Sequence, residues 1–164
     1  MRAAHLIVTT GLLSAALALD SSPASAEGIS AGGGLVYGTE IEELGIQLNG
    51  YYDLGDVVEN LRVGADFTYW FVDDPASVWT FNINGHYIFL RPDAALVYGL
   101  AGLNIYHYSV EAFGFETSVT EPGLNLGIGG EYSVAEQLGL YAELKYVISD
   151  ADQAVLGAGA RYRF

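Results

Sequence analysis

Apolar residues alternate with small or polar residues along the chain from Glu27 onward, in runs of about ten residues. Clusters of Gly, Asp, Pro and Ser separate these runs. Alternation with a period of two is typical of β-strands that have two different faces. The pattern predicts strands at residues 29–37, 44–53, 60–71, 78–90, 95–108, 123–132, 138–148 and 154–164.

The two faces of the predicted strands differ sharply in composition. One face carries bulky aliphatic and aromatic side chains, and no Asp, Glu, Lys or Arg falls on it. The other face carries amides, hydroxyls and charged groups, with glycines between them. The interior of an eight-stranded barrel is only wide enough for side chains to fill it. Because the bulky apolar set cannot share that space, we expect the apolar face to point outward and the polar face inward.

Aromatic residues lie near the strand ends on the apolar face. They form two predicted rims, Tyr37, Phe71, Trp79 and Tyr146 at one and Tyr52, Phe89, Tyr132, Tyr162 and Phe164 at the other. Two aromatic girdles around an aliphatic band are typical of barrels that span a bilayer. An open sheet edge in lipid would leave backbone groups unpaired, so the sheet must close. We therefore predict an all-β fold, a closed eight-stranded antiparallel up-and-down transmembrane β-barrel; a soluble lipocalin-like barrel is the alternative.

The first 26 residues have the pattern of a secretory leader. Arg2 lies in a short basic segment, residues 6–19 are apolar, and Ala24-Ser25-Ala26 provides the small residues of a cleavage site. The apolar stretch is shorter than the roughly 20 residues of a membrane-spanning helix, which leaves a retained anchor as the alternative. The predicted domains are a cleaved signal peptide at 1–26 and a barrel domain at 27–164.

An even number of strands places both ends of the exported barrel on the periplasmic side and the longest loop, residues 109–122, on the outside. This segment alternates around Gly114, so the hairpin is also predicted to continue above the membrane as a ribbon. A free strand edge on such a ribbon is a site for strand addition by a partner. Phe113 and Phe115 are the candidate contact residues of this loop.

Charge and composition exclude several function classes. The 164 residues carry a net charge of -14 with only 6 Lys and Arg, which disfavours a nucleic-acid partner. With no cysteine, the chain has no disulfide and no cysteine-ligated metal, and we predict no cofactor and no metal site. The acidic excess lies in turns and loops and is interpreted as a solvated rim. Bridging of lipopolysaccharide by divalent cations, Ca²⁺ binding at Asp73-Asp74 or Asp150 and Asp152, and a saline habitat are the alternatives.

Charged residues on the inward face are nearly balanced in sign. Buried charges are costly unless they are paired, so we expect these side chains to form ion pairs and hydrogen bonds that fill the lumen, with His86 and Tyr98 nearby. A small-solute pore or a proton path is the alternative. The predicted lumen network consists of Arg62, Asp66, Glu131, Glu143, Lys145, Arg161 and Arg163.

The segment 158–164 resembles the terminal assembly signal of small eight-stranded outer-membrane barrels of Gram-negative bacteria, the OmpX and opacity-protein class. The signal positions are Ala158, Ala160, Tyr162 and Phe164. Residues 127–132 and 138–146 are also similar to that class, which commonly places an inward acidic residue in the two strands before the last. The resemblance implies an integral outer-membrane protein in contact with the bilayer, lipopolysaccharide and the assembly machinery, with a structural or surface-interaction role.

One motif suggests an enzyme. His107-Tyr108-Ser109 has the His-x-Ser spacing of barrel lipid A deacylases, and Glu121 is the nearest candidate acid. A serine, a histidine and an orienting acid together hydrolyse esters. However, Val110 stands where that family has an asparagine. We therefore expect a protein that is not an enzyme, with deacylation as the alternative.

Overall fold

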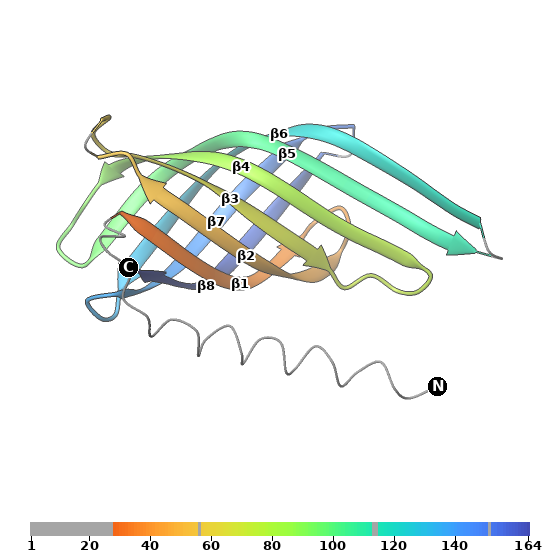
Figure 1. Ribbon diagram of the computed structural model, residues 1–164, viewed down its shortest axis with the longest axis horizontal. Coiled ribbons are helices and arrows are strands. Elements are labelled where there is room, and N and C mark those ends of the chain that lie inside the picture. The colour runs from red at the N-terminus through yellow and green to blue at the C-terminus, as the bar shows by residue number, and fades with distance from the viewer. Residues whose placement is uncertain (1–27, 56, 113–114, 151) are drawn as a thin grey trace.

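The computed structural model describes residues 28–55, 57–112, 115–150 and 152–164. Each strand pairs antiparallel with the next one in sequence, and β8 pairs with β1 to close the barrel (Figure 1). The predicted fold class is confirmed. The strands are β1 (Ile29–Gly38), β2 (Glu43–Asp53), β3 (Leu61–Trp70), β4 (Ala76–Leu90), β5 (Ala95–Ala112), β6 (Phe115–Ser133), β7 (Leu138–Ile148) and β8 (Gln153–Arg163).

The predicted signal peptide lies outside the described residues, so its boundary at residue 26 stays a prediction. Over the ranges that are described, no helix has the length and apolar character needed to cross a membrane. The first strand begins and the last strand ends at the same end of the barrel, where the Phe164 amide donates to the Ile29 carbonyl at 3.0 Å. We call this the terminal end.

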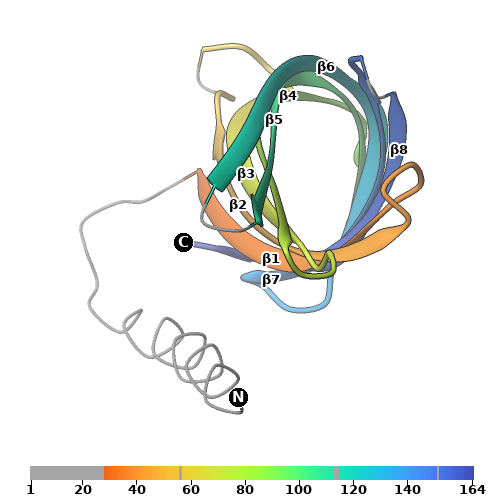
Figure 2. The same cartoon turned by 90° about the vertical axis from the view of Figure 1, so that its right-hand side faces the viewer.

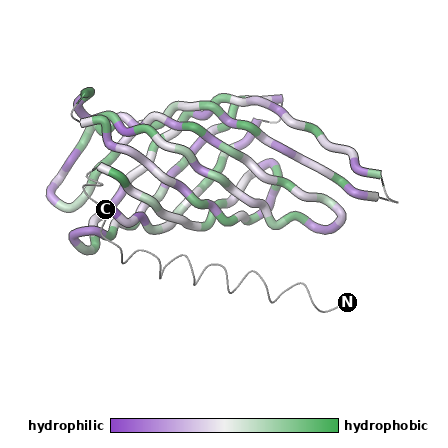
Figure 3. The backbone as a smooth tube through the Cα atoms, viewed as in Figure 1, coloured by the Kyte–Doolittle hydropathy of each residue, from purple (hydrophilic) through white to green (hydrophobic). Residues whose placement is uncertain are grey.

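Burial alternates along the strands as the period of two predicts. In β7, Leu140 and Leu144 are exposed on the outside, whereas Tyr141, Glu143 and Lys145, which alternate with the outward residues, are buried inside. Hydrophobic and hydrophilic residues also alternate along the tube in Figure 3. The described aromatic girdle residues are all at least partly exposed on the outer face. The predicted facing is confirmed, and the alternative with the apolar face inside the barrel is wrong.

The hairpin of β5 and β6 extends beyond the rest of the barrel (Figure 1). Pairing continues up to Ala112 and Phe115, so the loop expected at 109–122 is largely a strand pair, and the predicted ribbon is confirmed. On its other side, β6 pairs with β7 only from Leu124 onward. The segment 115–123 therefore has a free edge. We call the residues 109–112 and 115–123 the ribbon, and this end of the barrel the ribbon end.

The interior is less polar than the sequence suggested. A cluster near the ribbon end contains the buried apolar residues Val36, Trp70, Val78, Val147 and Val155. Ile41, Val72 and Tyr106 pack against it. A second cluster, of Ile88, Tyr98 and Leu100, lies nearer the terminal end. These residues share the inward face with the polar set, so the lumen contains apolar side chains as well as charged ones.

Candidate functional site: a charged network across the lumen

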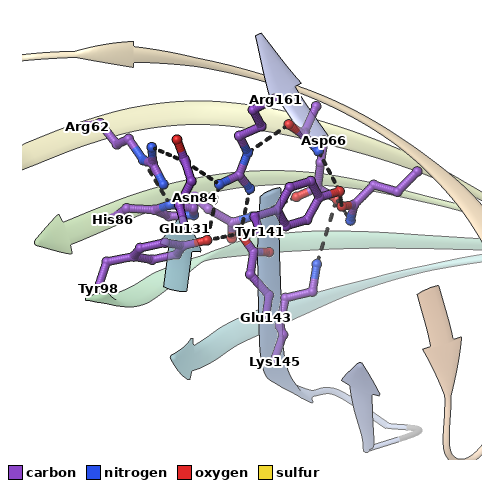
Figure 4. A network of polar contacts seen from close by, with 12 residues as sticks. Arg62, Asp66, Asn84, His86, Tyr98, Glu131, Tyr141, Glu143, Lys145 and Arg161 are labelled. Atoms are coloured by element: carbon purple, nitrogen blue, oxygen red, sulfur yellow. Dashed lines mark hydrogen bonds and ion pairs between the residues drawn. The ribbon is translucent and has the colours of Figure 1, made fainter. Parts of the chain in front are cut away.

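Arg161 of β8 is the centre of the polar interior (Figure 4). It is 1% exposed. Its Nη2 donates to Oε1 of Glu143 at 2.6 Å, and its Nη1 lies 3.4 Å from Oε2 of Glu131. The guanidinium also lies over the rings of Tyr141 and Tyr51, at 4.0 and 4.6 Å from the centroids. The arginine is therefore paired with two carboxylates and held between two aromatic rings.

Glu131 of β6 connects this centre to two further arginines, one on β3 and one on β8. Its Oε2 accepts from Nη1 of Arg62 on β3 at 3.1 Å, and its Oε1 accepts from Nη2 of Arg163 at 3.0 Å. The carboxylate of Glu131 thus forms ion pairs with three arginines. Such sharing reduces the cost of burying several like charges, because each cation faces a carboxylate.

A stack of three rings packs against Arg62 and Arg161 of the network. His86 lies between Tyr51 and Tyr98, with centroid distances of 4.4 Å to each. The Tyr98 hydroxyl donates to Glu143 at 2.6 Å and accepts from Arg161 at 3.1 Å. Glycines make room for these rings: a Cβ at position 129 would lie 2.6 Å from the Tyr98 ring, a spacing that folded proteins do not show. Sequence analysis placed His86 and Tyr98 here but missed Tyr51.

Asp66 of β3 forms the second centre, closer to the ribbon end. Its carboxylate accepts from the side-chain amides of Gln47, Asn82 and Asn84, at 3.1, 2.6 and 2.8 Å. Nζ of Lys145 lies 3.7 Å away. Asn125 continues the amide chain by donating to Asn82 and Asn84. Amides thus provide most of the hydrogen bonds to this carboxylate, a role that sequence analysis did not assign to them.

The seven residues of the predicted lumen network therefore lie together in the barrel. Six of them are buried, and the side chain of Arg163 is 39% exposed at the terminal end. Among the described residues, no three His, Cys, Asp or Glu side chains form a group that could hold a metal ion. The interior is thus a packed array of fixed charges and amides.

The residues of the enzyme hypothesis are not brought together. Nδ1 of His107 lies 2.8 Å from Oγ1 of Thr120, and its ring stacks on Trp79 at 4.7 Å. Glu121 is the register partner of Tyr106, one position away from His107. Because neighbouring residues of a strand point to opposite faces, Glu121 faces away from His107 and Ser109.

The terminal residues of the predicted assembly signal face outward from β8. Tyr162 and Phe164 form an edge-to-face pair with centroids 5.2 Å apart, and the Tyr162 hydroxyl donates to Gln137 at 2.8 Å. Ala158 and Ala160 lie on the same face of the strand. Of the candidate contacts on the ribbon, Phe115 is exposed, and Phe113 lies outside the described residues.

Residues 6–164 match the family described as outer membrane protein beta-barrel domain. The chain belongs to this family. Together with the outward apolar face and the closed sheet, this membership makes it an integral outer-membrane β-barrel protein. A search of curated proteins finds no match to the sequence.

Solved structures of small outer-membrane barrels are similar to this chain. Neisserial surface protein A is 19% identical with a TM-score of 0.66, covering 83% of this chain and 96% of that one. Ail, the attachment invasion locus protein of Yersinia pestis, is 20% identical with a TM-score of 0.62, covering 84% and 99%. The N-terminal barrel of OprF from Pseudomonas aeruginosa is 14% identical with a TM-score of 0.68, covering 84% and 98%. At these identities the likeness is one of fold.

Proposed function

We propose that this protein is a non-conducting outer-membrane barrel that acts at the cell surface. The observation that supports this is the chain of buried ion pairs from Arg62 through Glu131 and Arg161 to Glu143, which joins β3, β6, β8 and β7 across the lumen. A solute path through the barrel would have to break these pairs and leave buried charges without partners, which is strongly unfavourable.

Planar-bilayer recordings test the closed lumen. We expect the purified, folded protein to insert without producing stable conductance steps, because side chains fill an eight-stranded barrel. Heat-modifiable gel mobility of the same sample provides the control for folding. Reproducible steps of one size from the folded protein would contradict a closed lumen and favour the small-solute pore.

The surface role is assigned to the ribbon. In the proposed orientation both chain ends face the periplasm, the barrel contacts lipopolysaccharide, and the ribbon extends outside the cell. The free edge at 115–123 offers unpaired backbone groups to an extended strand of another protein. Phe115, 79% exposed beside that edge, supports such a contact. The similar barrel Ail is named the attachment invasion locus protein, which is consistent with a surface role for this fold.

The charge of the ribbon end restricts the partner. Its turns and ribbon contain Glu40, Asp73, Glu116 and Asp150 among other carboxylates, and all Lys and Arg of residues 28–164 lie elsewhere. Ail has been solved with the heparin analogue sucrose octasulfate. A polyanion of that kind would be repelled here, so we propose a partner that is neutral or cationic.

Trimming the ribbon tests this role. We expect replacement of residues 110–119 by Asn-Gly to leave the barrel folded, because the register partners His107 and Thr120 then close a four-residue hairpin loop, and the β6–β7 pairing begins only at Leu124. Bacteria that display the trimmed protein should attach to protein-coated surfaces no better than cells without it. The matched control is Ser133→Asn at the other end of β6. Attachment that survives trimming would remove the ribbon from the proposal.

We also propose that the protein has no deacylase activity. Residues 158–164 are proposed to act as its assembly signal. The position of Glu121 on the opposite face of the hairpin from His107 and Ser109 supports the first statement. The outward aromatic pair of Tyr162 and Phe164 at the end of the last strand supports the second.

A further inference from the structure

A small cavity lies at the ribbon end, next to the apolar cluster that contains Trp70. Its volume is about 160 Å³, and Glu40, Ile41, Tyr106 and Gln153 line it. Glu40 and Ile41 come from the turn between β1 and β2, which lies beside β8 in the view into this end (Figure 2). Ile41 and Tyr106 also pack against the apolar cluster. The cavity thus has an apolar side, and the Glu40 carboxylate and the Gln153 amide add strong oxygen acceptors to its lining.

Within the described residues, Gln153 brings an unpaired hydrogen-bond acceptor to the cavity. Its residue is only 7% exposed, yet among the described residues Oε1 has no hydrogen-bond partner. A buried acceptor without a donor destabilises the folded state, so such atoms are normally satisfied by a protein group, a water or a ligand. Since Gln153 lines the cavity, a donor bound there would satisfy this oxygen.

The electrostatic field at the ribbon end favours a cation as the ligand. Three of the arginines in residues 28–164 belong to the lumen network near the terminal end, Lys145 pairs with Asp66, and Arg91 lies in the turn between β4 and β5 at the terminal end. The carboxylates of the ribbon end therefore have no described Lys or Arg among them. Glu40 lines the cavity itself, and Glu121 is the register partner of Tyr106. Together, the negative charges of these carboxylates attract cationic ligands to the ribbon end.

We infer that this cavity binds a primary alkyl ammonium group, from a lysine side chain of a partner protein or from a free diamine. An ammonium has three N–H donors and no acceptor, which matches the Glu40 carboxylate and the Gln153 oxygen. The Tyr106 ring offers a face to the cation and Ile41 a surface to the alkyl chain. A volume of about 160 Å³ is well above what a single ordered water needs, so the cavity has room for the end of a lysine side chain.

A divalent cation fits this cavity less well. Ca²⁺ takes about six to eight oxygen ligands at short distance. Only one carboxylate lines the cavity, and no three acidic or histidine side chains gather within the described part of the chain. Binding in the cavity does not depend on which way the barrel faces, whereas access from outside the cell rests on the proposed orientation. The two proposals therefore fail separately.

Isothermal titration calorimetry with the full protein in nanodiscs tests the inference. The probes are 1,5-diaminopentane, Nα-acetyl-lysine amide and CaCl₂, with 1-pentanol as the uncharged control. We expect saturable binding of an amine and none of pentanol. Glu40→Gln and Gln153→Leu should each weaken it by about tenfold or more, since a hydrogen bond to a charged group contributes this order of affinity. Glu116→Gln, the same charge change on the ribbon, should alter it by less than about twofold.

The relative affinities of the probes and the effects of the variants show whether the site exists and which ligand it takes. Stronger binding of the lysine amide than of the diamine indicates a protein partner as the source, and the reverse indicates a free polyamine; both support the site. Equal weakening by Glu40→Gln and Glu116→Gln would show a general acidic field and overturn it. So would Ca²⁺ binding that Glu40→Gln abolishes, without amine binding. Glu40 is exposed, so its variant keeps the test valid even if Gln153→Leu does not fold.

Discussion

Replacing Arg161 by methionine is expected to lower the free energy of unfolding by about 3–5 kcal/mol. Arg161 is paired with Glu143 at 2.6 Å and Glu131 at 3.4 Å, and it also donates to Asn49 and Tyr98. Methionine fills part of the space but leaves Glu143 buried without its cation. The cost of breaking a buried pair comes mainly from the charge that remains.

Urea unfolding in micelles, followed by the fluorescence of the two tryptophans, measures this change. Arg163→Met is the matched control, because the side chain of Arg163 is 39% exposed and its pair with Glu131 should contribute less than about 1 kcal/mol. Adding Glu143→Gln to Arg161→Met removes the unpaired carboxylate and should recover part of the loss. If Arg161→Met and Arg163→Met cost the same, the lumen network does not carry the stability assigned to it.

Leu126→Arg is expected to destabilise the barrel by about 2–4 kcal/mol, because a charge on the lipid face near the bilayer midplane loses its hydration. Leu126 lies on β6 within the aliphatic band, opposite Ala101 of β5. Its 53% exposure in the isolated barrel corresponds to contact with acyl chains in the membrane.

Val119→Arg on the same strand provides the control. Val119 is 46% exposed, nearly as much as Leu126, but it lies on the ribbon, which we propose extends outside the membrane. An arginine there stays in water, so the expected change is within about 0.5 kcal/mol. Unfolding of both variants in lipid bilayers measures the difference. A similar cost at the two positions would show that Leu126 does not face lipid.

The fold could be predicted from the sequence because each strand of a membrane barrel has one face toward lipid and one toward the lumen. Apolar and polar residues therefore alternate along the strand. In β7, the exposed Leu140 and Leu144 and the buried Glu143 and Lys145 follow the parity without exception. The strand ends near the ribbon were harder to predict. The alternation of residues 109–121 around Gly114 is compatible with a long loop as well as with a paired ribbon, so the sequence predicted both.

The charged members of the lumen could be predicted for a similar reason, since an ionised residue on the inward face needs a partner there. Which partners meet depends on strand register and side-chain length. Arg161 reaches Glu143 on the adjacent strand, and Arg62 reaches Glu131 from the far side of the barrel. The inward apolar residues were missed because Val36 and Trp70 have apolar neighbours in the sequence. At such positions only the alternation along the strand indicates which residue faces the lumen.

The facing of the strands is the claim from which the rest follows, and cysteine scanning tests it directly. The chain has no native cysteine, so single cysteines at successive positions of β7 can carry a spin label. In bilayers, labels at Leu140, Leu144 and Tyr146 should collide with lipid-dissolved oxygen and be shielded from a water-soluble relaxation agent. Labels at Tyr141, Glu143 and Lys145 should be shielded from oxygen or prevent folding. Oxygen collisions that do not alternate along the strand, or that peak at Glu143, would contradict the account.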